Sequence, residues 1–377
     1  MGNFSQSNQF EASMTRKFRF VANDEVGELR HELYKRGAST QLIPPVAGLS
    51  SGGSWIQETP GLSLRCIRNV SVTEGSDLIL GDDFAILDKA TRQTTAKNIF
   101  HDSNLLGVNQ PEKTVDVKPS VSLGNFARAY SMLGVFSAHW GHFVCERLLG
   151  LSTILPLLPD DAAILVPDGI DQVQSQLLLD VLLAQGKLNK IYLIPKKQSV
   201  SIGELFYSNL PVIVSNDSTW TSIYDQTIQY FANTEMNRIV EAVCTQSDGP
   251  RKIFFTRGGG SSKALENIAE VEEVYRSRGY YIFRPEDHTY RQRQVILGAA
   301  EVVSGVFGSA FFNLMFCPRV MSVSVIAPLI RCIDQIGQSL FCPSGFIYYL
   351  AEAKEQCLHP TTSFDIRLID TWERSSP

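Results

Sequence analysis

The sequence lacks the features that mark three large classes of protein. Its longest apolar run, from Leu148 to Pro159, is interrupted by Ser, Thr and Pro and is shorter than the roughly 20 residues of a membrane span. The beginning of the chain has no hydrophobic stretch typical of a signal peptide. Acidic residues outnumber Lys and Arg by 39 to 34, so the basic surplus of a non-specific nucleic-acid binder is missing. We therefore expect a soluble, cytoplasmic protein that binds no nucleic acid and has no transmembrane segment, although it could act beside a membrane.

Cysteine is sparse, and its spacing argues against the usual cysteine-based sites. The seven cysteines include no C-x-x-C pair, and an odd number cannot all be paired within one chain. A reduced, intracellular protein explains this pattern better than a disulfide framework does. The net charge of −5 does not exclude a small anionic ligand, because backbone amides and one or two cations can hold it locally.

Length and composition predict a globular protein with two cores. The chain has 377 residues, 44% of them hydrophobic and 19% charged, whereas one domain usually takes about 100–200 residues. Clusters of Gly, Ser and Pro indicate that residues 1–60 are irregular, and two strands are expected over 63–71 and 77–88. Residues 1–120 contain almost nothing that points to a function.

From about residue 128 strands and helices alternate, which is typical of parallel sheets with both faces covered. In the first part of this region we predict helices over 139–157, 171–185 and 222–245, strands over 162–166 and 191–194, and a β pair around 204–214. In the second part we predict strands over 252–256, 280–283, 302–304 and 321–326, and helices over 263–278, 290–300 and from residue 310.

Two strand ends in the second part suit an anionic ligand. After the strand that ends at Thr256, Arg257 precedes three glycines, and Ser262 and Lys263 follow. Glycine lets the backbone approach an anion, a helix N-terminus favours negative charge, and arginine offers a planar fork for phosphate oxygens. The stretch over 305–313 repeats the order of strand, small-residue turn and helix. Because ligands of open parallel sheets bind beyond the carboxyl ends of the strands, we expect both corners to contribute to one site.

The predicted ligand-binding residues of these corners are Arg257, Gly258, Gly259, Ser262, Lys263, Gly308, Ser309 and Asn313. A simpler interpretation is that the triple glycine is a flexible turn, because it matches neither the G-x-G-x-x-G fingerprint nor a P-loop. Ser309 could be an ordinary turn residue. Asn313, on a mostly apolar helix, needs a partner if it is buried, which leaves a structural hydrogen bond or a ligand contact.

A third group of polar side chains lies on the helix that begins near residue 139. His139, His142 and Glu146 are spaced i, i+3 and i+7 and would share one face of an α-helix. Such a group can supply a general base with its orienting partner, so we predict these three residues to be catalytic. A solvated helix face is the main alternative. A metal site is less favoured, because the H-E-x-x-H arrangement is missing.

The order and spacing of these motifs resemble glycosyltransferases of family 61, and most closely their bacterial relatives associated with capsular or exopolysaccharide synthesis. The resemblance covers about 130–330. It is carried by His142-Phe143-x-x-Glu146, Phe254-Phe-Thr-Arg257, Lys263, Asn267, Gly279-Tyr280, Pro285-Glu286, Gln294, Ala299-Ala300 and Gly305-x-x-Gly308-Ser309-x-x-x-Asn313-Leu-Met-Phe316.

The resemblance implies an α/β protein of the GT-B type, with two facing Rossmann-like domains that have parallel sheets. It also implies an inverting, metal-independent transfer of sugar from a nucleotide-sugar, expected to be a UDP-sugar, to a glycan or lipid-linked acceptor. Arg257 would pair with the diphosphate, the Gly308-Ser309 turn would contact nucleotide or phosphate, and Glu286 would lie near the nucleotide. His142 and Glu146 would face the cleft. No cofactor is implied, and the chain has no Asp-x-Asp pair to hold a metal-bound diphosphate.

Two positions depart from the pattern of the family. Phe307 stands where many members have His, and Gly150 stands where Arg is common. These departures leave a second interpretation open, in which the protein is a non-catalytic nucleotide-sugar or glycan-binding partner in a polysaccharide-assembly complex. A pyruvyl-type transferase or a dinucleotide oxidoreductase on a similar fold is a third, although Phe283-Arg284 replaces the acidic residue that would hold a ribose.

The predicted domain organisation follows from these elements. We expect an irregular, β-containing N-terminal segment over 1–125, an acceptor-side domain over 126–220, a nucleotide-sugar-binding domain over 221–345 and a helical tail over 346–377.

Overall fold

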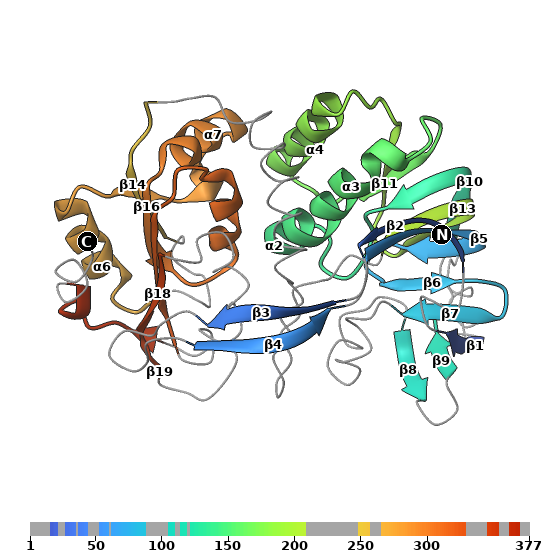
Figure 1. The fold of residues 1–377 in the computed structure, drawn as a ribbon, viewed down its shortest axis with the longest axis horizontal. Helices are drawn as coiled ribbons and strands as arrows, with labels where there is room; N and C mark the ends of the chain where they lie inside the picture. The colour runs from blue at the N-terminus through green and yellow to red at the C-terminus, as the bar shows by residue number, and fades with distance from the viewer. Residues whose placement is uncertain are drawn as a thin grey trace, which may run out of the picture.

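The chain folds into a mixed α/β structure in which two β-sheets lie on either side of a layer of helices (Figure 1). The computed structural model describes residues 16–21, 27–34, 37–43, 53–59, 62–87, 105–109, 114–118, 121–208, 248–256, 265–328, 345–353 and 362–369. Within these residues no helix is long and apolar enough to cross a membrane.

The first sheet is mixed and contains eleven of the described strands. Its strands are β1 (Arg16–Val21), β2 (Glu28–Tyr34), β5 (Leu62–Thr73), β6 (Leu78–Leu80), β7 (Phe84–Leu87), β8 (Leu105–Asn109), β9 (Thr114–Val117), β10 (Val121–Ser131), β11 (Ala163–Pro167), β12 (Ile191–Ile194) and β13 (Gln198–Ser208). They follow the order β12-β11-β10-β13-β5-β6-β7-β1-β9-β8, and β2 pairs with β5. Strands β10 to β13 are parallel, whereas β5 joins β13 antiparallel, so the N-terminal strands continue the Rossmann-like part of the sheet.

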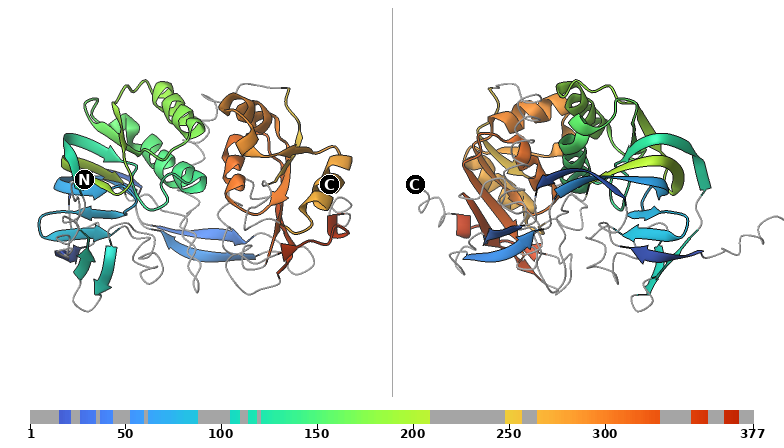
Figure 2. Two further views of the ribbon diagram at one scale, coloured as in Figure 1. Left: turned by 180° about the vertical axis from the view of Figure 1, so that it is seen from behind. Right: turned by 45° about the vertical axis from the view of Figure 1, so that its right-hand side comes forward.

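The expectation that residues 1–60 are irregular is wrong for the part that the structure describes. Besides β1 and β2, strands β3 (Gly37–Ile43) and β4 (Gly53–Thr59) form an antiparallel hairpin. This hairpin extends from the first half of the molecule toward the second (Figure 2). The strands escaped prediction because charged residues, as in β2, interrupt the apolar alternation that marks a half-buried strand.

The second sheet is parallel throughout, as the alternation of strands and helices predicts. It has the order β15 (Tyr281–Phe283), β14 (Lys252–Phe255), β16 (Val302–Val306), β17 (Ser322–Ala327) and β18 (Phe346–Leu350). β16 and β17 are buried along almost their whole length, as expected for strands covered on both faces.

The predicted helical tail over 346–377 is wrong for the described residues near its beginning. Phe346–Leu350 forms β18, the fifth strand of the second sheet, and the short strands β19 (Glu352–Ala353) and β20 (Thr362–Ser363) pair with each other. The sequence Phe-Ile-Tyr-Tyr-Leu is rich in aromatic residues, which favour strands, and Phe346, Tyr348 and Tyr349 are buried. One edge strand of the second sheet, β18, is therefore formed by residues that were assigned to the tail.

The helices occupy most of the predicted segments. They are α4 (Gln172–Ala184), α6 (Ile268–Ser277), α7 (Tyr290–Ala299) and the 3₁₀ segments η4 (Pro285–Asp287) and η5 (Ser309–Phe316). Asp171 caps the beginning of α4 in a capping box, in which its carboxylate accepts a hydrogen bond from the backbone N–H of Gln174. The helix expected over 222–245 lies outside the described residues, as does the beginning of the helix expected over 263–278.

The helix predicted over 139–157 is continuous but not regular. It consists of α2 (Trp140–His142), a π-helical turn η2 (Phe143–Leu148), α3 (Leu149–Ile154) and a 3₁₀ turn η3 (Leu155–Leu157). All six residues of α3 are buried. One apolar core reaches from this helix and α4 into the second half, where it includes Phe255 and Phe311, so the two halves pack directly against each other.

Candidate site between the two halves

The carboxyl end of β10 begins the first corner of the candidate site. The loop that follows, over 132–139, is held by Asp77, whose carboxylate accepts the Val135 amide at 3.1 Å and pairs with Arg147 at 2.7 Å. A side chain at Gly134 would overlap with the Arg147 guanidinium. On the other side of the loop, Gln174 donates to the Ala138 carbonyl at 2.9 Å. The first corner is thus fixed by the β5–β6 turn and by the beginning of α4.

Phe136 lies in this loop in a strained backbone conformation. Its φ of 58° is in the left-handed region, which is unfavourable for a bulky residue other than glycine. The Phe136 ring lies against the imidazole rings of both histidines predicted to be catalytic. Its centroid is 4.9 Å from the ring centroid of His139 and 5.5 Å from that of His142. Backbone strain that the surrounding contacts maintain is a frequent feature of functional sites. Phe136 therefore groups the two histidines at the strand end.

The third predicted catalytic residue, Glu146, lies in the π-helical turn. The i, i+3, i+7 spacing assumed a regular α-helix, but the backbone over Phe143–Leu148 forms i→i+5 hydrogen bonds. The side chain of Glu146 is outside the part of the chain that the structure describes. His139 is exposed and immediately precedes α2, whereas His142 is half-buried. Single π-helical turns occur often at functional sites, which agrees with the position of this one.

The turn after β16 forms the second corner. Gly308 has φ 141° and ψ −173°, a combination that is open essentially to glycine alone. Ser309, the first residue of η5, is exposed. Asn313 is buried; its amide donates to the Ala310 carbonyl at 2.8 Å, which is a structural hydrogen bond of the kind considered from the sequence. Phe307 is fully buried in the shared core, so the position where many relatives have His points away from solvent here.

The carboxyl ends of β14 and β15 lie next to this corner. Thr256 donates to the Glu272 carboxylate at 2.6 Å, and Arg284 pairs with the same carboxylate at 3.1 Å. Glu272 thereby connects Thr256, at the end of β14, with Arg284, at the end of β15. Of the predicted ligand-binding residues, Arg257, Gly258, Gly259, Ser262 and Lys263 lie outside the described residues.

Glu286 lies in η4, just beyond β15, and is exposed. Burial lowers the pKa of Arg293 in α7. The negative charges of Asp171 and Glu286 offset this lowering only in part. Arg293 donates to the His288 carbonyl at 3.1 Å and lies 5.9 Å from the centre of the Trp140 ring. A partly buried guanidinium therefore lies between the two halves.

The two corners meet through α2 and η5. A Cβ atom at Gly141 would be only 2.7 Å from the Phe312 ring, so glycine is needed for this close approach. The Trp140 and Phe316 rings are 6.2 Å apart. A cavity of about 20 Å³ between the halves is lined by these two aromatic rings and by Asn313, and it is large enough for about one water molecule. Within the described part of the chain, the buried Trp140 Nε1 and Asn313 Oδ1 atoms have no hydrogen-bond partner.

Several residues that build the site were missed from the sequence. Phe136, Asp77 and Arg147 lie outside the three polar motifs, and only the folded chain brings Asp77 to Arg147. Thr256 and Arg284 could have been found, because each follows a predicted strand directly and ligands bind at such strand ends.

Comparison with known proteins finds a family match that covers α2 with His142 and the whole second corner, whereas Asp77 and the loop over 132–139 precede the matched residues. The family model described as Glycosyltransferase 61 matches residues 140–323. The match begins at the first residue of α2 and ends within β17, so it includes η2, the end of β14 and the Gly308 turn. No curated protein matches the chain.

Proposed function

This chain is a glycosyltransferase of family 61, and on that premise we propose that it moves a sugar from a nucleotide-sugar to a glycan or lipid-linked acceptor, with inversion and without a metal. The site between the two sheets is the proposed reaction centre. The proposal includes a GT-B arrangement, in which the first half binds the acceptor and the second half binds the donor. Polysaccharide biosynthesis is the proposed context, and a UDP-sugar is the proposed donor.

One observation carries the proposal: the helix that bears His142 packs directly on the helix that follows the Gly308 turn. Gly141 and Phe312 make this contact, so a group suited to proton transfer and a turn suited to an anion belong to the same site. A transferase needs both, because the acceptor loses a proton while the departing diphosphate gains charge. The contact therefore favours a reaction between ligands held by the two halves.

In the proposed reaction, His142 or Glu146 takes the proton of an acceptor hydroxyl. The acceptor oxygen forms a bond to the anomeric carbon from the face opposite the nucleotide, and the bond from that carbon to the diphosphate oxygen breaks. The proton remains on the base and the nucleoside diphosphate leaves. A single displacement of this kind inverts the anomeric centre.

The donor half stabilises the charge that develops on the diphosphate. Arg257 and Lys263 are the proposed cations, and the amides around Gly308 and Ser309 are the proposed neutral donors. The hydrogen bonds that join Thr256, Glu272 and Arg284 support this assignment, because they fix the end of β14, and Arg257 is the next residue after Thr256 in the sequence. Arg284 adds a cation at the neighbouring strand end.

The experiment is a thermal-shift measurement with UDP, GDP, CDP, NAD and several UDP-sugars, with and without EDTA. A ligand that binds only the native state raises the melting temperature. We expect a shift with one nucleoside diphosphate that survives EDTA and is lost in Arg257→Ala. In a transfer assay, the same variant should lose about 100-fold in turnover, the usual effect of removing one preorganised donor.

Matched controls separate the alternatives. Arg367→Ala removes an exposed cation that pairs with Asp365 and should leave the shift intact. A shift with NAD alone, or with none of the nucleotides, would overturn the proposed donor. A shift that EDTA abolishes would overturn metal independence.

A further inference from the structure

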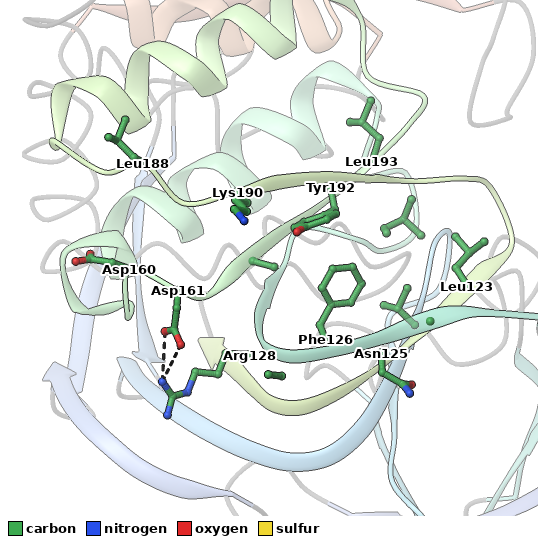
Figure 3. A pocket seen from close by; sticks show the side chains of 15 residues that line it. Leu123, Asn125, Phe126, Arg128, Asp160, Asp161, Leu188, Lys190, Tyr192 and Leu193 are labelled. Carbon is green, nitrogen blue, oxygen red and sulfur yellow. Dashed lines mark hydrogen bonds and ion pairs between the residues drawn. The ribbon is translucent and has the colours of Figure 1, made fainter.

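A pocket lies on the face of the first sheet that is opposite its helices. Along β10 and β11, Tyr130 and Ile164 belong to the core under the helices, whereas the alternating residues Ala129 and Ala163 belong to a separate apolar cluster on the other face. The pocket opens on this second face and has a volume of about 780 Å³ (Figure 3). It is therefore separated from the proposed reaction centre by the sheet itself.

The apolar part of the pocket contains two aromatic rings. Phe126 of β10 and Tyr192 of β12 meet edge to face, with ring centroids 4.8 Å apart. Tyr192 is 39% exposed, although it belongs to a strand. Leu123 and Leu188 add exposed apolar surface to the rim (Figure 3). Exposed apolar surface gathered around a hollow marks a binding site more often than scattered single residues do.

The polar part of the pocket has no excess of either charge. Arg128 is held by two carboxylates: its Nε atom is 2.8 Å from Glu204. Its Nη1 atom is 3.0 Å from Asp161 (Figure 3). Asp160 accepts from Lys187 at 2.9 Å. The charged residues that line the pocket are Arg128, Lys190, Asp160 and Asp161, two of each sign. This balance disfavours a nucleotide, a phosphate group or an anionic membrane surface, each of which requires a net positive site.

We propose that this pocket binds a neutral oligosaccharide, at a site distinct from the reaction centre. Sugar rings combine apolar C–H faces, which pack on aromatic rings, with hydroxyl groups, which bond to carboxylate and amide side chains. The pocket offers Phe126 and Tyr192 for the first and Asp160, Asp161 and Asn125 for the second. Its volume lies within the usual range of about 300–1,000 Å³ for small-ligand sites. The choice of a glycan among neutral amphipathic ligands rests on the proposed function.

A site here would hold the glycan at a distance from the reacting hydroxyl. Because the sheet separates the two sites, a chain bound on this face contributes affinity without entering the displacement. A long acceptor or product that spans both sites gains effective concentration at the reaction centre. Long chains should therefore be better substrates than short ones of the same terminal structure.

The test is calorimetric titration of the full chain with neutral hexasaccharides of β-1,4-glucose, α-1,4-glucose, β-1,4-xylose and β-1,4-mannose, alongside the monosaccharides. We expect one hexasaccharide to bind more tightly than its monosaccharide. Tyr192→Ala should weaken this binding about tenfold, the equivalent of one aromatic contact of about 1.4 kcal/mol. Tyr192→Trp should retain it. Tyr281→Ala removes a tyrosine of similar exposure on the other sheet and should bind like the wild type.

A second variant guards against misfolding of the first. Leu123→Ser changes a side chain on the rim that is already exposed and should also weaken binding while the melting temperature is kept. Absence of binding to every hexasaccharide, or binding that both variants leave unchanged, would overturn the proposal. So would a concentration-dependent dimer that Tyr192→Ala dissociates, because the face would then be an interface between two copies.

Donor binding distinguishes this inference from the proposed function. If the nucleotide-induced thermal shift is present in the wild type and in Tyr192→Ala but no glycan binds, only the pocket assignment fails. If a hexasaccharide binds in a Tyr192-dependent manner but no nucleotide shifts the melting temperature, only the proposed function fails.

Discussion

The two corners of the candidate site are built from different chemistry. At the end of β10, aromatic and imidazole rings stack in a strained loop, and the charged pair that fixes the loop, Asp77 and Arg147, stays behind it. At the ends of β14 and β15, a carboxylate, a hydroxyl and a guanidinium form one chain, and the neighbouring turn requires glycine at position 308. The first corner thus presents groups that can exchange a proton. The second has a guanidinium, Arg284, that a carboxylate fixes, beside a turn that requires glycine.

This difference indicates how a transferase can divide its work between two halves. A general base takes up a proton during the reaction, so this task needs a side chain that can change its protonation state, as an imidazole can. Donors that stabilise a departing diphosphate work best when they are fixed before the reaction. The anchoring by Glu272 suits the second task, and the stacked histidines suit the first.

The largest effect should come from the proton-transfer side. His142→Gln or Glu146→Gln, whichever is the base, should lower turnover by about 100-fold or more, because general-base catalysis contributes about 10²–10⁴. Turnover and its pH profile should be measured for both variants, and the base should be the residue whose loss removes the rising limb. His31→Gln, on β2, is the control. If both variants keep turnover within tenfold of the wild type, the first corner does not supply the base.

The next effect tests how the first corner is held. The Asp77 and Arg147 side chains are 20% and 17% exposed, and Asp77→Ala leaves the part-buried guanidinium without this carboxylate. The free energy of unfolding should fall by about 3 kcal/mol, the lower end of the effect of breaking a buried pair, because some solvent reaches this one. Chemical denaturation measures the loss. Asp365→Ala breaks an exposed pair and should leave the melting temperature unchanged; equal effects of the two substitutions would contradict the anchoring role.

A smaller effect is expected at the second corner. Gly308→Ala forces a side chain into a backbone conformation reserved for glycine and should cost about 1–3 kcal/mol of stability. The nucleotide-induced thermal shift should shrink with it, because the amides of the turn move. Gly169→Ala is the matched control, since a Cβ there would make an ordinary contact of 3.6 Å with Ala138. A normal nucleotide shift in Gly308→Ala would remove this turn from the donor site.

The smallest effect concerns Glu74, in the same β5–β6 turn as Asp77. Burial raises the pKa of Glu74, and the hydrogen bond from the Lys197 amide and the charge of Lys196 lower it only in part. A raised pKa in the folded state gives stability that is present at low pH and is lost as the pH rises through that raised pKa. Glu74→Gln keeps an acceptor for the Lys197 amide and should raise the melting temperature at pH 7. The gain should disappear below the ordinary pKa of a glutamate; a gain that is equal at every pH would mean that ionisation of Glu74 is not its cause.

The second half of the fold was predictable because its strands and helices alternate strictly. The apolar runs at 252–256, 302–304 and 321–326 mark three parallel strands, and the Gly308 turn is visible as small residues between a strand and a helix. The strand expected over 63–71 is present as β5, whereas the described strands within residues 1–60 were not predicted; β2, for example, depends on pairing with β5, which is distant in sequence. The same holds for the Asp77–Arg147 pair, which joins residues 70 positions apart.

Within the site, sequence spacing located the histidines but not their surroundings. The grouping of His139 and His142 followed from helical periodicity. The role of Phe136 was not predicted, because no sequence pattern indicates a left-handed backbone conformation at a phenylalanine. The π-helical turn was also not predicted, since the i, i+3, i+7 spacing assumes a regular α-helix.

The π-helical turn has a consequence for how this site could be tuned. Because all six residues of α3 are buried, the orientation of that helix is fixed by the core, and η2 is the joint through which α2 is attached to it. Removing one residue from the joint would restore α-helical bonding and rotate α2 by about 100° relative to α3, the angle of one residue in an α-helix. The direction in which His142 faces thus depends on the length of η2, and a deletion here would re-aim the imidazole while the buried side chains of α3 stayed in place.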